Sequence, residues 1–108
     1  MKHLALFSLI FLSINAFAGG TTTSTIDFIQ INSTGSLQNR AFIKLHTPAT
    51  NHPACATDNR FTVDLTTDAG KSIFSSVIAA KASDREMFIG GTGGCTEGFE
   101  NVSYVRFL

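Results

Sequence analysis

The sequence has little charge and no excess of either sign. Eight Lys and Arg residues stand against eight Asp and Glu residues, so the formal net charge at pH 7 is zero. The basic residues form neither a stripe nor a cluster of the kind that binds phosphate backbones or anionic lipid headgroups. Nucleic acid and anionic membrane surfaces are therefore poor candidate partners.

No hydrophobic run in the sequence is long enough to span a membrane. The longest one, from Leu4 to Leu12, falls short of the about 20 apolar residues that a span needs. A basic start at Lys2, this short apolar core and the small-x-small triplet at 16–18 are instead the pattern that a signal peptidase reads. We expect residues 1–18 to be a cleaved signal peptide, and the mature chain to be secreted or periplasmic with no membrane span.

Cysteine is also scarce, with only Cys55 and Cys95 in the chain. Removal of residues 1–18 from the 108-residue chain leaves about 90 residues, enough for a single domain at 19–108 with a small core. In an oxidising compartment two cysteines most simply form one disulfide, the alternative being two free thiols. Closing a loop of some 40 residues stabilises a fold by about 4 kcal/mol in the chain-entropy treatment.

Alternating hydrophobicity predicts a mainly β domain. Strands are expected at five alternating or apolar segments: 26–31, 37–46, 60–65, 86–90 and 102–107. The first has apolar residues on both faces, which favours a bend or bulge that lets it serve two sheets. Thr21 to Thr25 is expected to be a short tether, and 47–59 and the glycine-rich 90–101 are expected to be loops.

After Leu65 the apolar residues change to helical spacing. One amphipathic helix of about four turns is expected to begin after an N-cap at Thr67 or Asp68. Its predicted apolar face consists of Ile73, Phe74, Val77, Ile78 and Ala80. Lys71 and several serines cover the other side.

The resulting element order predicts an OB-fold-like barrel. Three strands, a helix and two more strands are the order of this five-stranded Greek-key barrel, with one α-helix between strands 3 and 4. Its strands 3 and 5 are parallel neighbours, and Cys55 and Cys95 each precede one of them, so the disulfide should lie at one pole. Another small α+β sheet with the same order is the alternative.

Signatures of catalysis and of cofactor binding are incomplete. The segment 69–72 lacks the first glycine of a phosphate-binding loop, and the glycines at 90–94 lead into no helix. His46 and His52 lie near Cys55, but two histidines beside a disulfide cysteine do not complete a metal site. The sequence also contains no nucleophile elbow and no paired-acid motif. We therefore expect a non-enzymatic domain without metal or cofactor.

The remaining candidate site is the solvent side of the predicted barrel. The outward residues of the second strand mix cationic, aromatic and hydrogen-bonding groups: Arg40, Phe42, Lys44 and His46. Such mixtures suit sugars or a protein partner, because an aromatic face packs on a sugar ring while polar neighbours bind its hydroxyls. Phe99 and Tyr104 are expected near the disulfide pole. The alternative for Phe42 is that it covers the helix or a neighbouring strand.

Three segments carry a family resemblance. Thr34-Gly35-Ser36-Leu37-Gln38-Asn39 is similar to a turn between first and second strands, Cys55-Ala56 to a cysteine after a second strand, and 70–82 to a helix, in one toxin family. The chain resembles the receptor-binding B subunits of bacterial AB5 toxins, in particular those of the subtilase-cytotoxin type. It is also similar to small secreted bacterial proteins of no assigned function.

The resemblance implies a ring-shaped homo-oligomer, a pentamer in the toxin family, that binds a cell-surface glycan or receptor. The family's glycan pocket uses a serine near the start of the first strand, and the matching positions here are Ser24 and Thr25. With Arg40, Phe42 and Lys44, these are the candidate ligand-binding residues. The alternative function is a secreted or periplasmic protein-interaction module, such as an inhibitor or an envelope-associated factor, that uses the same surface.

Overall fold

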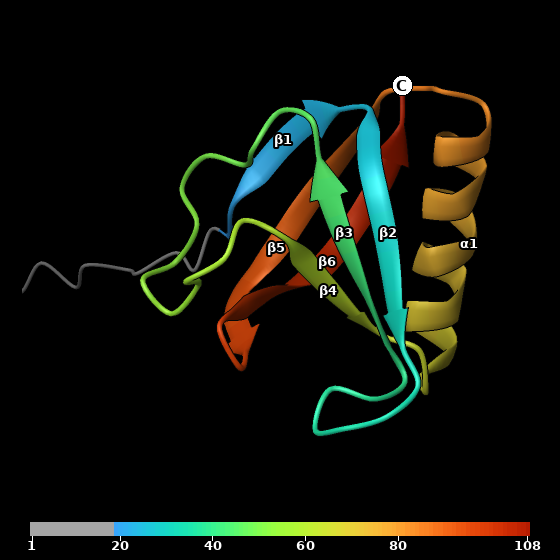
Figure 1. Cartoon of the computed structure of the whole chain (residues 1–108). Coiled ribbons are helices and arrows are strands. Elements are labelled where there is room, and N and C mark those ends of the chain that lie inside the picture. The colour runs from blue at the N-terminus through green and yellow to red at the C-terminus, as the bar shows by residue number, and fades with distance from the viewer. Residues whose placement is uncertain (1–18) are drawn as a thin grey trace, which may run out of the picture.

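The computed structural model describes residues 19–108, so the predicted signal peptide at 1–18 lies outside the described residues. Within this range, six strands form one sheet and a single helix packs against it, which confirms the prediction of a mainly β domain (Figure 1). The elements are β1 (Thr21–Ser24), β2 (Ile26–Asn32), β3 (Arg40–Leu45), β4 (Phe61–Asp64), α1 (Asp68–Ala82), β5 (Met87–Thr96) and β6 (Phe99–Phe107). No helix in this range is long and apolar enough to cross a membrane.

The strands lie in the order β1-β5-β6-β4-β3-β2. Neighbours are antiparallel, except that β4 and β6 are parallel. The strands at the two ends of this order, β1 and β2, are consecutive in the chain and are separated only by Thr25. One bend in the chain therefore connects the first and last strands of the sheet, and a register shift between Ile26 and Phe28 follows it.

Residues 21–24, predicted to be part of a tether, form a strand, so the structure has six strands where five were predicted. Thr21 pairs with Gly90 and Ser24 with Met87, so β1 forms a full antiparallel ladder with β5. The segment has no apolar residue, which is why hydrophobicity did not reveal it. Threonine is nevertheless a good strand former, because its branched side chain fits a pleated surface.

The core lies between the inner face of the curved sheet and α1. The predicted inward face of the second strand is confirmed, since Ala41, Ile43 and Leu45 are at most 2% exposed, but Phe42 on the predicted outward face is 2% exposed too. Phe61 and Val77 are fully buried with them. Thr67 is the N-cap of α1 and its side chain accepts a hydrogen bond from Gly70 N at 2.9 Å.

The predicted apolar face of the helix was only partly right. Val77 and Ala80 are fully buried, and Ile73 and Phe74 are half-buried against the core. Ile78 is 42% exposed, because the contact of α1 with the sheet is centred on the line from Ile73 through Val77 to Ala80.

The prediction of a loop at 90–101 was also wrong. Strand β5 continues to Thr96, and a two-residue turn at Glu97-Gly98 leads directly into β6. Both turn residues have positive φ, 48° and 88°, which suits the sharp hairpins that match strand twist. The glycines are accommodated as irregularities of the strand, with register shifts at Gly90/Gly91 and between Gly91 and Cys95.

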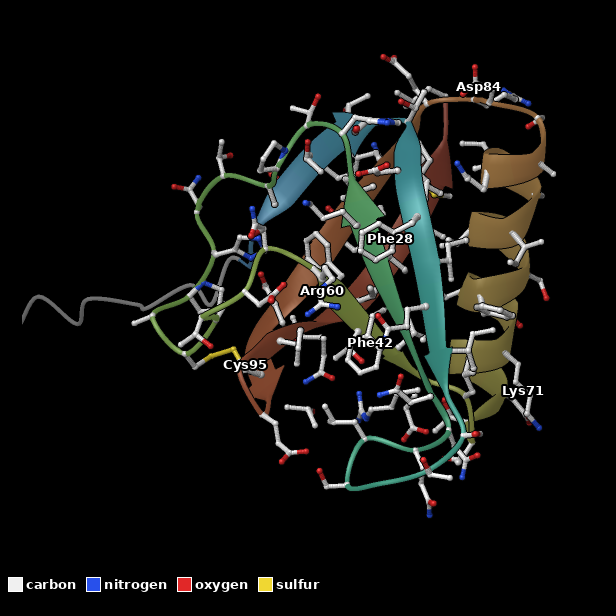
Figure 2. The ribbon with its side chains drawn as sticks, viewed as in Figure 1. Phe28, Phe42, Arg60, Lys71, Asp84 and Cys95 are labelled. Carbon is white, nitrogen blue, oxygen red and sulfur yellow. A yellow bond between two sulfur atoms is a disulfide. The ribbon has the colours of Figure 1, made fainter. Side chains whose placement is uncertain are left out.

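The predicted disulfide is confirmed. Cys55 and Cys95 are bonded, with a Cα–Cα distance of 6.0 Å, and the described residues contain no free cysteine. The bond ties the long connection between β3 and β4 to the end of β5, on the side of the molecule away from α1 (Figure 2).

Candidate functional site

The connection between β3 and β4 forms a hollow of about 260 Å³, which we call the loop pocket. It is lined by Pro48, Ala49, His52, Ala56, Thr57, Asp58 and Asn59. The backbone N–H groups of Thr57 and Asp58 both donate to the carbonyl of Gly98, at 2.9 and 3.3 Å. The connection is thus held to the β5–β6 hairpin by hydrogen bonds as well as by the disulfide.

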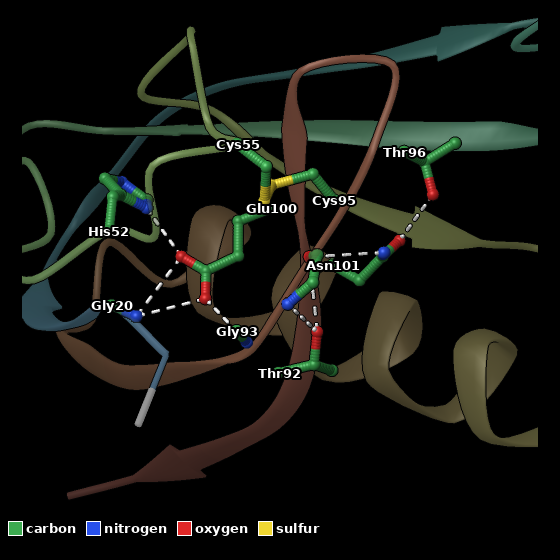
Figure 3. The surroundings of a disulfide bond; sticks show 10 residues. Gly20, His52, Cys55, Thr92, Gly93, Cys95, Thr96, Glu100 and Asn101 are labelled. Carbon is green, nitrogen blue, oxygen red and sulfur yellow. Dashed lines mark hydrogen bonds and ion pairs between the residues drawn. A yellow bond between two sulfur atoms is a disulfide. The ribbon is translucent and has the colours of Figure 1, made fainter. Parts of the chain in front are cut away.

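Beside the loop pocket lies a histidine bound to a buried carboxylate. Glu100 is fully buried, and its Oε1 lies 2.6 Å from Nδ1 of His52 (Figure 3). A carboxylate only accepts, so Nδ1 of His52 is the donor in this hydrogen bond. The other ring nitrogen, Nε2, is buried and makes no hydrogen bond to any described residue.

Glycines enclose the rest of the carboxylate. Gly20 N donates to both oxygens, at 3.2 and 3.0 Å, and Gly93 N donates to Oε2 at 3.0 Å (Figure 3). A Cβ built on Gly91 would lie only 2.0 Å from Oε2, and one on Gly19 only 2.4 Å from it. No side chain fits at these two positions. We call the surrounding residues Gly19, Gly20, His52, Gly91 and Gly93 the Glu100 cage.

On the other side of the loop pocket, an ion pair joins it to an aromatic pair. Asp58 accepts from Nε and Nη2 of Arg60 at 2.9 and 3.0 Å. These hydrogen bonds lower the pKa of the Asp58 carboxyl and raise the pKa of Arg60. The guanidinium lies over Phe99, 4.9 Å from the ring centroid, and Phe99 meets Phe42 edge to face at 4.8 Å.

The predicted outward residues of β3 share one face, but they do not form an open site. Phe42 is 2% exposed because Arg60 and Phe99 pack against it, whereas the alternative drawn from the sequence had Phe42 itself covering the helix or a neighbouring strand. Arg40 reaches the other way, to Thr62 and Asn101 at 3.3 and 3.2 Å. Lys44 is half-exposed and opposite Phe28.

Ser24 and Thr25 lie where the chain bends between β1 and β2. Ser24 is 2% exposed, and its hydroxyl donates to the Thr25 carbonyl at 2.7 Å and accepts from Thr47 N at 2.9 Å. Thr25 is more open, with Oγ1 2.9 Å from Nδ1 of His46. Tyr104, expected near the disulfide, instead stacks on Phe88. At this bend, Thr25 and His46 are accessible to a ligand, whereas Ser24 is buried.

Sequence reasoning singled out His52 but missed the other residues of the loop pocket and of the Glu100 cage. Asp58 and Asn59 looked like ordinary loop residues, and Glu100 lay in a segment expected to be a loop. The glycine pairs 19–20, 90–91 and 93–94 were the one available signal, since glycine marks places where another group approaches the backbone closely. Within residues 19–108, no three metal-ligating side chains are grouped to hold a metal ion.

Comparison of the chain with protein-family models, with curated proteins and with solved structures found no match.

Proposed function

We propose that the mature chain is a secreted or periplasmic, non-enzymatic binding module that recognises a cell-surface glycan, as the resemblance to AB5 toxin B subunits implies. We also propose that its sheet is an OB-fold-like barrel. If β1 and β2 are counted as two halves of one bent first strand, the strands of the sheet, read from β2 to β1, follow the order first, second, third, fifth, fourth and first again. The third and fifth strands of that scheme, β4 and β6, are the parallel pair, which supports the assignment.

The observation that carries the proposal is the mixed chemistry of the loop pocket. A carboxylate, an amide and a hydroxyl, from Asp58, Asn59 and Thr57, stand beside the apolar surfaces of Pro48 and Ala49. Sugars need both polar and apolar contacts, because their rings have apolar faces and polar edges. Its volume of about 260 Å³ is slightly below the roughly 300–1,000 Å³ of small-molecule pockets, which suits one sugar residue at the end of a glycan.

The ion pair makes Asp58 a fixed acceptor for sugar hydroxyls. Arg60 holds both carboxylate oxygens and keeps the pKa of Asp58 low, so the group is charged at neutral pH. Thr57 and Asn59 are exposed and can meet a ligand directly. His52, the imidazole lining the pocket, has its Nδ1 engaged by Glu100, and no described hydroxyl or thiol hydrogen-bonds its Nε2. This arrangement favours binding over nucleophilic catalysis.

A glycan array followed by titration calorimetry tests the proposal. We expect the mature protein to bind a restricted set of glycans, and Asn59→Ala to weaken binding at least about tenfold, the loss of a good hydrogen bond to a bound ligand. Asn32→Ala is the matched control, because Asn32 lies on β2 outside the loop pocket. No array binding would contradict the proposed glycan recognition, and unchanged affinity of Asn59→Ala would contradict the loop pocket as its site.

A second substitution locates the site. If the ligand sits at the bend, as the toxin resemblance implies for Ser24 and Thr25, Thr25→Ala reduces binding and Asn59→Ala does not. That outcome keeps glycan recognition and moves it from the loop pocket to the bend.

One observation favours the alternative, a protein-interaction module. Large apolar side chains are exposed on and beside β2: Phe28 at 40%, Ile31 at 55% and Ile78 at 42%. Phe28 is opposite Lys44 and Ile31 opposite Ala41, so these two side chains are on opposite faces of β2, and each can contact a protein partner separately. Binding of a purified envelope protein that Phe28→Ser abolishes and Asn59→Ala leaves intact would favour this function over glycan recognition.

A further inference from the structure

The carboxylate of Glu100 is fully buried, and no lysine or arginine of residues 19–108 pairs with it. Among residues 19–108, no lysine or arginine nitrogen lies within ion-pair distance of Glu100; its partners are His52 and the N–H groups of Gly20 and Gly93. Removing a carboxylate from water costs several kcal/mol unless charge and hydrogen bonds compensate it. The hydrogen bonds are present, but the one ion-pair partner of Glu100 among residues 19–108, His52, is positively charged only when it is protonated.

Gly19 lies directly against this carboxylate. It is buried, and its Cβ direction points to Glu100 Oε2 at 2.4 Å and to the Gly91 carbonyl oxygen at 2.2 Å. With standard bond lengths, the backbone nitrogen of Gly19 lies within about 5 Å of Oε2. The next nitrogen along the chain, that of Gly20, already donates to both carboxylate oxygens.

We propose that the Glu100 cage is a socket for a free N-terminal glycine produced by proteolysis of the Ala18–Gly19 bond. Hydrolysis of that amide gives a carboxylate on Ala18 and an amine on Gly19; water supplies the hydroxyl and the proton, and the amine takes a second proton from solvent. The resulting α-ammonium pairs with Glu100. This inference rests on the proposed export and cleavage, and it is independent of what the domain binds.

Cleavage changes the electrostatics because it converts a neutral amide into a cation. An α-amino group has an ordinary pKa of about 7.7–8.0, so it is largely protonated at pH 6.5. Two titratable groups face it, Glu100 from β6 and His52 from the connection between β3 and β4. The ion pair holds Gly20 against Glu100 and so fastens the start of β1 to the sheet. Processing is thereby coupled to the stability of the domain.

The cage also explains why the residue after the cleavage point is glycine. A methyl group at position 19 would overlap both Glu100 and the Gly91 carbonyl. Gly91 closes the opposite side for the same reason, with a Cβ position 2.0 Å from Oε2. The socket therefore accepts glycine and excludes larger N-terminal residues.

A double-mutant cycle on the mature protein tests the ion pair. The two changes are acetylation of the Gly19 amine, which removes its charge, and Glu100→Gln. At pH 6.5 we expect acetylation to raise the unfolding equilibrium constant of the wild type at least about tenfold, and to have a much smaller effect in Glu100→Gln. The matched control is Glu97→Gln, an exposed carboxylate at the hairpin tip, in which acetylation should act as in the wild type.

A raised α-amino pKa gives the expected pH dependence. The stabilisation by the Gly19 α-ammonium is complete below the α-amino pKa of the unfolded chain, about 7.7–8.0, and is lost as the pH rises through the α-amino pKa of the folded protein. Acetylated and free proteins should therefore differ at pH 6.5 and converge at high pH. Equal urea midpoints at pH 6.5 would overturn the proposal.

A second measurement does not depend on whether Glu100→Gln folds. In the native wild type, the amine of Gly19 should react with an N-hydroxysuccinimide ester at pH 7.5 at least about tenfold more slowly than in the urea-unfolded protein, because pairing and burial protect it. An equally reactive amine, or an exported protein that starts at another residue, contradicts the socket. Failure of glycan binding with a protected Gly19 amine would overturn the proposed ligand and leave the socket standing.

Discussion

Removal of the disulfide should take away a large part of the stability of this domain. Cys55 and Cys95 are 40 residues apart, and the loop-closure treatment gives a contribution of about 4 kcal/mol for a loop of that length. A domain of about 90 residues has a total stability of roughly 5–13 kcal/mol. Cys55 is exposed, so replacing it with alanine removes little buried surface and isolates the effect of the cross-link.

The test is urea unfolding of the double variant Cys55→Ala/Cys95→Ala. The chain has no tryptophan, so far-UV circular dichroism is the suitable signal. We expect the free energy of unfolding to fall by 3–4 kcal/mol, which moves the midpoint by about 1–4 M urea for the m-values of small proteins. Wild type treated with a reducing agent should match the variant. A loss below about 1 kcal/mol would refute the reasoning, since it would mean that the fold already restrains the loop.

Three further perturbations address packing, charge and assembly. Gly91→Ala should destabilise by about 1–3 kcal/mol in thermal unfolding, because the new methyl group overlaps Glu100, whereas Gly94→Ala, with its nearest neighbour at 3.5 Å, should cost less. The lowered pKa of Asp58 stabilises the fold at pH values above the pKa of the unfolded state, and this stabilisation is lost as the pH falls through the pKa of the folded state. Arg60→Gln should therefore make the free energy of unfolding depend less on pH below about pH 4. A pH dependence in that range equal to that of the wild type would contradict the Asp58–Arg60 ion pair. If the chain forms the ring that its resemblance implies, sedimentation should show an oligomer, and Ser75→Arg on the exposed face of α1 a smaller species; a wild-type monomer at micromolar concentration rules the ring out.

The parts of the fold that follow from local periodicity could be predicted from the sequence. Ala41, Ile43 and Leu45 are on one face of β3 and are buried, and Thr67 caps the helix where the pattern changes. The disulfide followed from the cysteine count. The strand β1 could not be found this way, because its threonines carry no hydrophobic signal and its formation depends on pairing with β5, which is distant in sequence.

The candidate site was less predictable for a related reason. Phe42 is on the outward face of β3, as the alternation predicts. Its burial depends on Arg60, directly before β4, and on Phe99, the first residue of β6. Burial of Glu100 depends on three segments that meet only in the folded chain, one of them at Gly20, 80 residues away. An alternating pattern predicts toward which face of its own strand a side chain points. It does not predict which residues from distant segments pack over that side chain.

The pairing of β1 with β5 sets the order in which the sheet can form as the chain is synthesised. Thr21 pairs with Gly90, so β1 has no partner until nearly the whole chain has been synthesised, and Cys55 can pair with Cys95 only after 40 further residues. Such non-local pairings fold slowly, and unpaired strand edges promote aggregation in the interval. The threonines of β1 suit this delay, because a polar strand that waits alone adheres less to other chains than an apolar one.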